Sequence, residues 1–202
     1  MYIENYKSKK YISIWLGFMF IVISIMIVIG GLTRLTDSGL SITEWQLFSG
    51  FLPPLSITDW NNYFDLYKKI PEFKEQNYLM TLQEFKVIFW WEWVHRFFGR
   101  LIGILFIIPL IIFTIKEGFR KLLSLYFIFF LICFQGFIGW YMVSSGLIDR
   151  VDVSHFRLSL HLIIAFLIIS LLLWNYLSLN KIGNSSINIK FSIYSFFLFL
   201  IF

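Results

Sequence analysis

The 202-residue chain is 58% hydrophobic and 21% aromatic, only 14% of its residues are charged, and its net charge is +5. Soluble domains carry about 25% charged residues, so this composition excludes a secreted, cytosolic or nucleic-acid-binding protein. Uncharged runs extend over residues 11–33, 101–115, 122–148 and 158–180. Because about 20 apolar residues cross the hydrocarbon core of a bilayer, the sequence predicts an all-α, polytopic transmembrane four-helix bundle.

The first span is predicted at residues 12–33, directly after Lys7, Lys9 and Lys10. It is too long for the hydrophobic part of a signal peptide and ends without a small-residue cleavage site, so we expect it to be retained. A loop over residues 34–88 follows. Loops of this length are uncommon without a role, and its many aromatic side chains predict that it folds against the membrane surface.

The second, third and fourth spans are predicted at residues 89–115, 122–144 and 156–179. Residues 1–180 would then form one four-helix unit. Residues 181–202 would hold an inner loop and the start of a fifth span, because the last hydrophobic stretch is too short to cross a bilayer. We therefore expect the chain to be part of a longer protein.

The distribution of Lys and Arg predicts the orientation of the bundle. These residues are densest in the N-terminal segment and in the turns at 116–121 and 181–190, which lie on one side of the predicted topology. Since short cytoplasmic segments carry an excess of positive charge, the N-terminus is predicted on the cytoplasmic or matrix side, and the loop 34–88 outside.

Two of the three histidines are predicted at the same depth. His95 lies 21 residues before Lys116, and His161 lies 20 residues before Lys181. At a rise of 1.5 Å per residue the two imidazoles differ in depth by only about 2 Å, whereas His155 lies about 9 Å nearer the outer boundary. Two histidines at one depth on parallel helices suggest axial ligands of one haem iron. Alternatively, each histidine hydrogen-bonds a neighbouring helix.

Glu92 is a candidate catalytic residue, because a carboxylate near the hydrocarbon edge is costly. It precedes His95 by three residues, so both side chains project from one face. The alternative is a helix-stabilising pair with Arg96 at i+4. Arg96, Arg100 and Arg157 are candidate partners of haem propionates, although snorkelling to the outer interface is the alternative for the last two.

Five motifs carry a family resemblance: GGLTRLTDSGLS at 30–41, EWVHR at 92–96, QG at 135–136, GWYMV at 139–143 and VSHFRL at 153–158. Together they resemble the N-terminal half of the haem A synthases, in the form found in mitochondria and related bacteria. The resemblance covers about residues 20 to 170. The glycine-rich opening combined with Glu-x-x-His-Arg is highly specific, whereas Glu-x-x-His alone is weak.

The resemblance implies an eight-helix protein of two pseudo-symmetric halves, each with a histidine pair. It implies haem b as a cofactor in the C-terminal half, which would lie beyond these residues, and haem O as the substrate of the N-terminal half. The family oxidises a porphyrin methyl of haem O to a formyl group, through hydroxymethyl haem, for cytochrome c oxidase. His95 and His161 match the N-terminal pair, Glu92 matches the family's essential glutamate, and His155 matches no ligand.

The resemblance also implies a location and partners. The location would be the bacterial inner membrane or the mitochondrial inner membrane. The partners would be membrane lipid, haem O synthase and an electron donor, with self-association as a further expectation and no nucleic acid. Without a second histidine pair, we do not expect these 202 residues alone to catalyse the reaction.

Two alternative functions stay open on the sequence. A b-type cytochrome with two histidine ligands would transfer electrons within the membrane and leave its haem unaltered. A non-catalytic membrane assembly factor would purify without haem.

Overall fold

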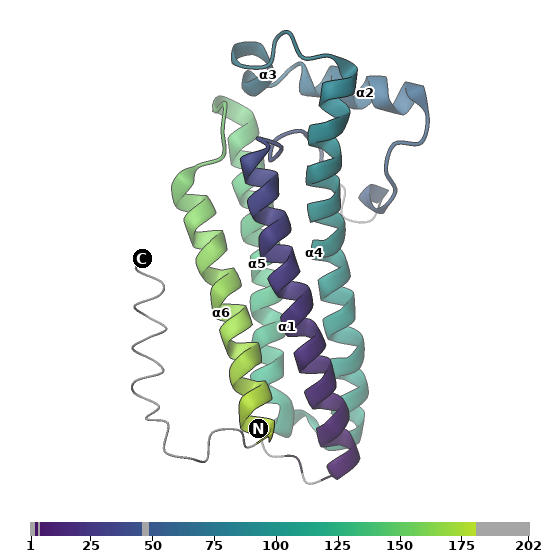
Figure 1. The fold of residues 1–202 in the computed structure, drawn as a ribbon, viewed down its shortest axis with the longest axis vertical. Coiled ribbons are helices and arrows are strands. Elements are labelled where there is room, and N and C mark those ends of the chain that lie inside the picture. The colour runs from purple at the N-terminus through teal and green to yellow at the C-terminus, as the bar shows by residue number, and fades with distance from the viewer. Residues whose placement is uncertain (1–2, 4, 46–48, 181–202) are drawn as a thin grey trace.

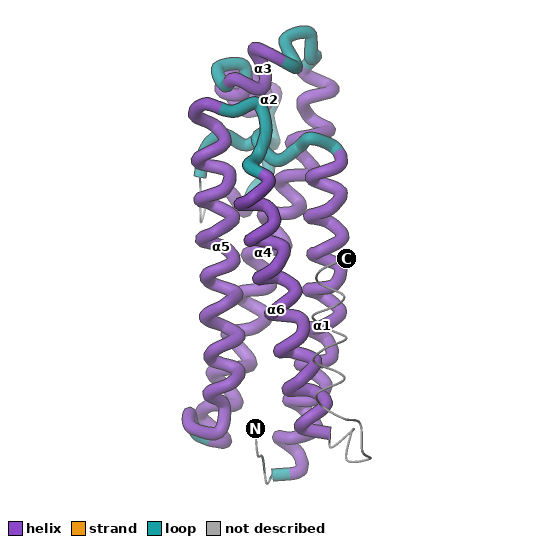
Figure 2. The backbone as a smooth tube through the Cα atoms, turned by 90° about the vertical axis from the view of Figure 1, so that its left-hand side faces the viewer, coloured by secondary structure: helices purple, strands orange, loops and turns teal. Residues whose placement is uncertain are grey.

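Four long helices form the body of the protein (Figure 1). The computed structural model describes residues 3, 5–45 and 49–180, and this part of the chain contains helices and no strands. Four helices are long and apolar enough to cross a membrane: α1 (Tyr6–Leu35), α4 (Leu82–Glu117), α5 (Leu123–Asp149) and α6 (His155–Asn180). They run side by side as a bundle in two views (Figures 1 and 2). The predicted all-α, multi-pass class is thereby confirmed.

The helices are longer than the predicted spans, most clearly in α4, which begins at Leu82 rather than near residue 89. A capping box explains this start. Thr81 Oγ1 accepts from the backbone N–H of Glu84, and the Glu84 carboxylate accepts from the N–H of Thr81 at 2.7 Å. The helix ends before Gly118, whose φ of +87° favours glycine. The N-terminal end of α4 therefore extends beyond the predicted apolar span.

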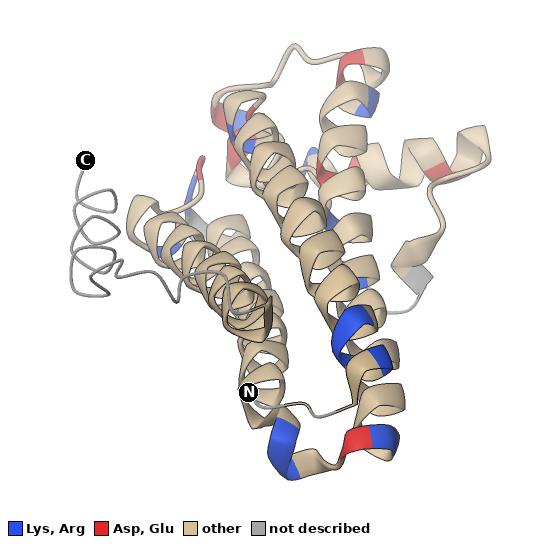
Figure 3. Ribbon diagram, turned by 60° about the horizontal axis from the view of Figure 1, so that its bottom comes forward, with Lys and Arg blue, Asp and Glu red and all other residues tan. Residues whose placement is uncertain are grey.

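The arrangement of the helices places α4 and α6 diagonally across the bundle. α1 packs against both α4 and α6, and α5 packs against the same two helices. We call the end at which α1 begins the inner end and the opposite end the outer end. Long uncharged stretches of helix separate the charges near the two ends (Figure 3).

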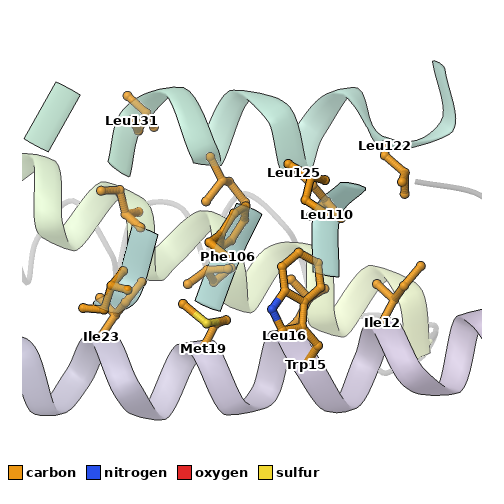
Figure 4. Close-up of a cluster of buried hydrophobic side chains, with 14 of the residues drawn as sticks. Ile12, Trp15, Leu16, Met19, Ile23, Phe106, Leu110, Leu122, Leu125 and Leu131 are labelled. Carbon is orange, nitrogen blue, oxygen red and sulfur yellow. The ribbon is translucent and has the colours of Figure 1, made fainter. Parts of the chain in front are cut away.

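The inner part of the bundle is tightly packed (Figure 4). Trp15 of α1 contacts Phe106 of α4 with ring centroids 4.9 Å apart, and its indole N–H donates to the carbonyl of Leu105 at 3.1 Å. Met19, Leu110 and further aliphatic side chains of all four helices complete this core. Burial of such side chains is worth about 1.5–3 kcal/mol each in water, and in lipid the same close packing holds helices together.

Two short helices cover the outer end: α2 (Ile57–Tyr67) and α3 (Pro71–Glu75) (Figure 1). A second core of aromatic side chains joins them to the first turns of α4, with Trp60, Phe64 and Tyr67 packed on Phe85 and Phe89. The segment predicted as an outer loop is thus a small folded cap.

Two 3₁₀ turns complete the described elements: η1 (Ser49–Phe51) in the segment before α2, and η2 (Phe119–Leu122) between α4 and α5. The predicted inner loop and start of a fifth span, residues 181–202, lie outside the described residues.

Candidate functional site

The structure brings His95 of α4 and His161 of α6 together, although the two helices lie diagonally in the bundle. Each imidazole faces one of the two helices that pack against both α4 and α6: His95 faces α1, and His161 faces α5. His155 lies in the first turn of α6, and its side chain is exposed.

A glycine of a neighbouring helix lies against each of these two imidazoles. A Cβ built on Gly30 of α1 would sit 3.1 Å from Cε1 of His95, and one built on Gly139 of α5 would sit 3.1 Å from Cε1 of His161. Any larger residue would press on the ring. Both glycines belong to the resemblance motifs, but their contacts with the histidines could not be derived from the sequence, because they depend on how the helices cross.

One nitrogen of each ring is buried without a hydrogen-bond partner. These atoms are Nδ1 of His95 and Nδ1 of His161. The Nε2 atoms of the two rings are not among the buried atoms that lack a partner. Buried polar atoms in folded proteins normally have a partner. The pair therefore does not fit the alternative in which each histidine hydrogen-bonds a neighbouring helix, and it fits imidazoles held for a ligand at Nε2.

The two histidines lie in a layer of the bundle that the core does not fill. Four stretches at this level contain no buried residue, and the structure describes all of them: 24–32 of α1, 93–101 of α4, 139–145 of α5 and 155–163 of α6. The layer is about 10–13 Å deep at 1.5 Å per residue. Protein interiors are otherwise close-packed, so the bundle is packed less tightly in this layer than in its inner core.

Glu92 is enclosed and fully hydrogen-bonded. Its side chain is 3% exposed. Oε1 accepts from Arg96 at 3.0 and 2.5 Å, and Oε2 accepts from the hydroxyl of Ser41 and the backbone N–H of Ile42, both at 2.7 Å. The carboxylate therefore joins α4 to the segment that follows α1. The pairing with Arg96 that the i+4 spacing offered is present.

Arg96 continues the same connection. Its guanidinium donates to the carbonyls of Ile42 at 2.8 Å and Glu44 at 3.3 Å, and it lies over the ring of Trp45. With four hydrogen bonds in use, Arg96 holds the 42–45 segment against α4. Ser41 and Ile42 could not be predicted as partners of Glu92, because about 50 residues separate them from it in the chain.

The other two candidate arginines occupy different surroundings. Arg100 donates to the carbonyl of Gly50 at 3.2 Å and lies over Phe51, so it holds the next part of the same segment. Arg157 of α6 donates to the hydroxyl of Ser145 and lies over the ring of Tyr141, with 4.7 Å between its Cζ atom and the ring centroid. It belongs to the layer that contains the histidines.

A second buried carboxyl lies in the cap. Glu72 of α3 is 3% exposed, and its Oε1 accepts from the hydroxyl of Tyr67 at 3.0 Å and from Asn77 Nδ2 at 3.4 Å. Burial raises the pKa of Glu72 to about 8; the Tyr67 hydrogen bond opposes this shift, and the negative charge of Glu92 adds to it. Burial also raises the pKa of Tyr67.

Comparison with known proteins finds a matching family model and several related sequences. The family model of the cytochrome oxidase assembly proteins, COX15-CtaA, matches residues 13–202. The heme A synthase of Pelagibacter ubique is 54% identical over 186 residues, which cover 90% of this chain and 55% of the relative. The heme A synthases of Maricaulis maris and Agrobacterium fabrum are 50% and 48% identical over 175 and 170 residues, or 86% and 83% of this chain and 51% and 47% of the relatives.

The chain thus spans about half the length of the curated relatives that it matches. No solved structure matches it.

Proposed function

The chain belongs to the COX15-CtaA family of cytochrome oxidase assembly proteins, and we propose that it is the part of a haem A synthase that binds haem O as substrate. His95 and His161 hold the haem iron through their Nε2 atoms. The single observation that supports this most strongly is that both histidines lie in the unfilled layer, each with a buried, unpartnered Nδ1.

The chemistry of the donor set suits this role. Neutral imidazole is a good ligand of haem iron, and four-helix bundles build haem sites from side chains on facing helices. Gly30 and Gly139 leave space for the two rings beside α1 and α5. The substrate supplies the porphyrin methyl group that is oxidised, and the protein supplies binding, orientation and proton transfer.

Glu92 is the residue that we assign to proton transfer. It lies one helical turn before His95, and its Oε2 atom shares a 2.7 Å hydrogen bond with the Ser41 hydroxyl. This hydrogen bond holds the carboxylate oxygen at a defined position, from which Glu92 accepts and returns a proton of the substrate as its methyl group is oxidised. Arg96 fixes the other carboxylate oxygen and thereby the direction in which Oε2 faces.

Arg157 is the propionate partner that the geometry favours. It precedes His161 by four residues, so both side chains project from one face of α6, with Arg157 one turn nearer the outer end. Guanidinium groups pair well with carboxylates. Arg96 instead donates to the carbonyl of Ile42, and Arg100 donates to the carbonyl of Gly50 in η1.

The protein is a multi-pass membrane protein, and the proposal extends to its setting. The inner end faces the cytoplasm or the mitochondrial matrix, the cap faces the opposite side, and haem O synthase supplies the substrate. An electron donor and a haem b cofactor, outside the described residues, complete the reaction system.

Product analysis tests the proposal. The chain is co-expressed, together with the C-terminal half that the family implies, with a source of haem O, and extracted haem is identified by pyridine haemochrome spectra and mass. Haem A, with its formyl group, is the expected product, and it disappears in His95→Ala and His161→Ala but persists in His155→Ala. Bound but unaltered haem would identify an electron-transfer cytochrome, and purification without haem would identify an assembly factor.

A further inference from the structure

Gln135 of α5 lies beside His161 of α6 and has an unused hydrogen-bonding atom. Its side-chain Nε2 donates to the backbone carbonyl of His161 at 2.9 Å. Its Oε1 is buried and has no partner. One glutamine thus contacts a candidate ligand through its donor while its acceptor is unoccupied.

The unused atoms of the two residues are complementary. Nδ1 of His161 is also buried without a partner. A neutral imidazole that binds iron through Nε2 carries its proton on Nδ1, so this atom becomes a hydrogen-bond donor. Histidine ligands of metals almost always donate this proton to a carbonyl, a carboxylate or water. Among the described residues this nitrogen has no other partner, and Gln135 carries the matching acceptor.

We infer that Gln135 is a positioning residue for His161, whose Nδ1–H donates to Gln135 Oε1 when haem is bound. This inference rests on the proposed ligation of haem by His161. The terminal torsion of a glutamine side chain is broad, so rotation of the amide turns Oε1 toward a new partner without movement of the helices. The hydrogen bond fixes the plane of the imidazole and increases its basicity.

The two ligands become inequivalent as a result. Nδ1 of His95 lies 3.5 Å from the Cβ position of Gly30, a residue with no side-chain acceptor. Among the described residues, no hydrogen-bond acceptor is paired with this nitrogen. His161 is therefore the more basic ligand, and His95 the one released more readily.

Three variants of the full chain separate this role from a structural one. Gln135→Leu removes both the acceptor and the link to the His161 carbonyl. Gln135→Glu removes the donor to that carbonyl but keeps an acceptor. Asn175→Leu is the matched control: Asn175 is a buried amide that joins α6 to Ser124 of α5, about 21 Å from His161 along the helix.

Each variant is loaded with haem O, and the reduction potential, the low-spin electron paramagnetic resonance (EPR) signal and the rate of haem dissociation are measured. Gln135→Leu is expected to raise the potential and to speed dissociation about 10–100-fold, because a less basic ligand stabilises ferric iron less. Gln135→Glu is expected to shift the potential the opposite way, and Asn175→Leu to leave it unchanged.

A shift in the same direction for the Leu and Glu variants would overturn the inference, since both lack the link to the His161 carbonyl. The inference would also be overturned if the reduction potential of Gln135→Leu matched that of Asn175→Leu. This comparison tests the inference even if the Glu variant does not fold. Failure of the proposed function looks different: wild-type protein would bind no haem, or His161→Ala would leave its spectrum unchanged.

Discussion

Gly139 of α5 faces the imidazole of His161 so closely that a Cβ on the glycine would lie 3.1 Å from the ring. A Cβ on Gly30 of α1 would likewise lie 3.1 Å from the ring of His95. The two helices that carry the histidines lie diagonally in the bundle, and the two helices that carry the glycines occupy the other diagonal. The lack of a side chain at each glycine therefore leaves space for the neighbouring ring.

The first prediction is that Gly139→Ala or Gly30→Ala weakens haem binding. The added methyl group pushes the imidazole by a few tenths of an ångström, and an off-rotamer side chain costs about 0.5–1.5 kcal/mol. Haem affinity should fall by about two- to tenfold, measured by titration of the purified protein with haem O.

The controls for this prediction are Gly31→Ala and Gly136→Ala, because a Cβ at either position meets nothing within 4 Å. These variants change helix propensity in the same way but should bind haem as the wild type does. Equal losses in all four proteins would show that the glycines matter for the helices and not for the rings.

The second prediction concerns Glu92. Glu92→Gln preserves the shape of the side chain but removes its proton exchange, so haem should still bind while haem A formation falls by about 10²–10⁴-fold. Arg96→Gln removes the partner of Oε1 and the bonds to the carbonyls of Ile42 and Glu44, but it leaves Ser41 as the partner of Oε2, so its effect on product should be smaller. Extracted haem, identified by mass, provides the measurement.

Glu92 would be a structural partner of Arg96 if Glu92→Gln lost its haem, or if Arg96→Gln reproduced every effect of Glu92→Gln. Ser41→Ala adds a third comparison, since it removes the hydroxyl from Oε2 and leaves the ion pair. It should reduce product formation and leave haem occupancy unchanged.

The third prediction is a pH dependence of stability that comes from Glu72. Its folded pKa of about 8 lies above the usual 4.5, so between these values the folded protein binds more protons than the unfolded chain. The contribution of Glu72 to stability is therefore greatest below pH 4.5, falls as the pH rises, and levels off above pH 8, by roughly 3–5 kcal/mol in total.

Glu72→Gln should remove this dependence and unfold at a higher temperature than the wild type at pH 9. Glu75→Gln, at an exposed position of the same helix, should keep the wild-type profile. Thermal unfolding in detergent at a series of pH values provides the measurement, and parallel profiles for wild type and Glu72→Gln would contradict the assignment.

The fourth prediction concerns the outer end. Arg34 at the end of α1 forms two 2.7 Å hydrogen bonds with Asp152 between α5 and α6. Both side chains are partly exposed, so the pair is worth about 0.5–1 kcal/mol after solvent screening. Asp152→Asn should lower the midpoint of thermal unfolding by about 1–4 °C, with less effect in 1 M salt. Asp65→Asn, which breaks an exposed pair within α2 and its C-cap, should change the midpoint less.

Much of the fold follows from the spacing of charges along the chain. The uncharged runs predicted all four long helices, and the distance of each histidine from the next lysine predicted that His95 and His161 share a depth. These features are local, or they depend only on the rise of a helix. The 3.6-residue period likewise offered the pair Glu92–Arg96, which the structure contains.

The contacts that complete the site could not be predicted from the sequence. Ser41 meets Glu92, and Gly139 meets His161, only because segments distant in sequence are brought together by packing. The sequence predicted that the segment before α4 folds, but it did not predict α2 and α3, because these helices are short and are held by an aromatic cluster rather than by a strong helical pattern. Burial of Glu72 had no sequence signal, since acidic residues are common in loops.

The most direct test of the central claim is the EPR spectrum of the protein loaded with ferric haem O. Two imidazole ligands at the iron give a low-spin signal in the wild type, and the account predicts that His155→Ala retains it. His95→Ala and His161→Ala should each convert the signal to the high-spin form or lose the haem. A low-spin signal that survives in His161→Ala, or disappears in His155→Ala, would contradict the ligand pair on which the account rests.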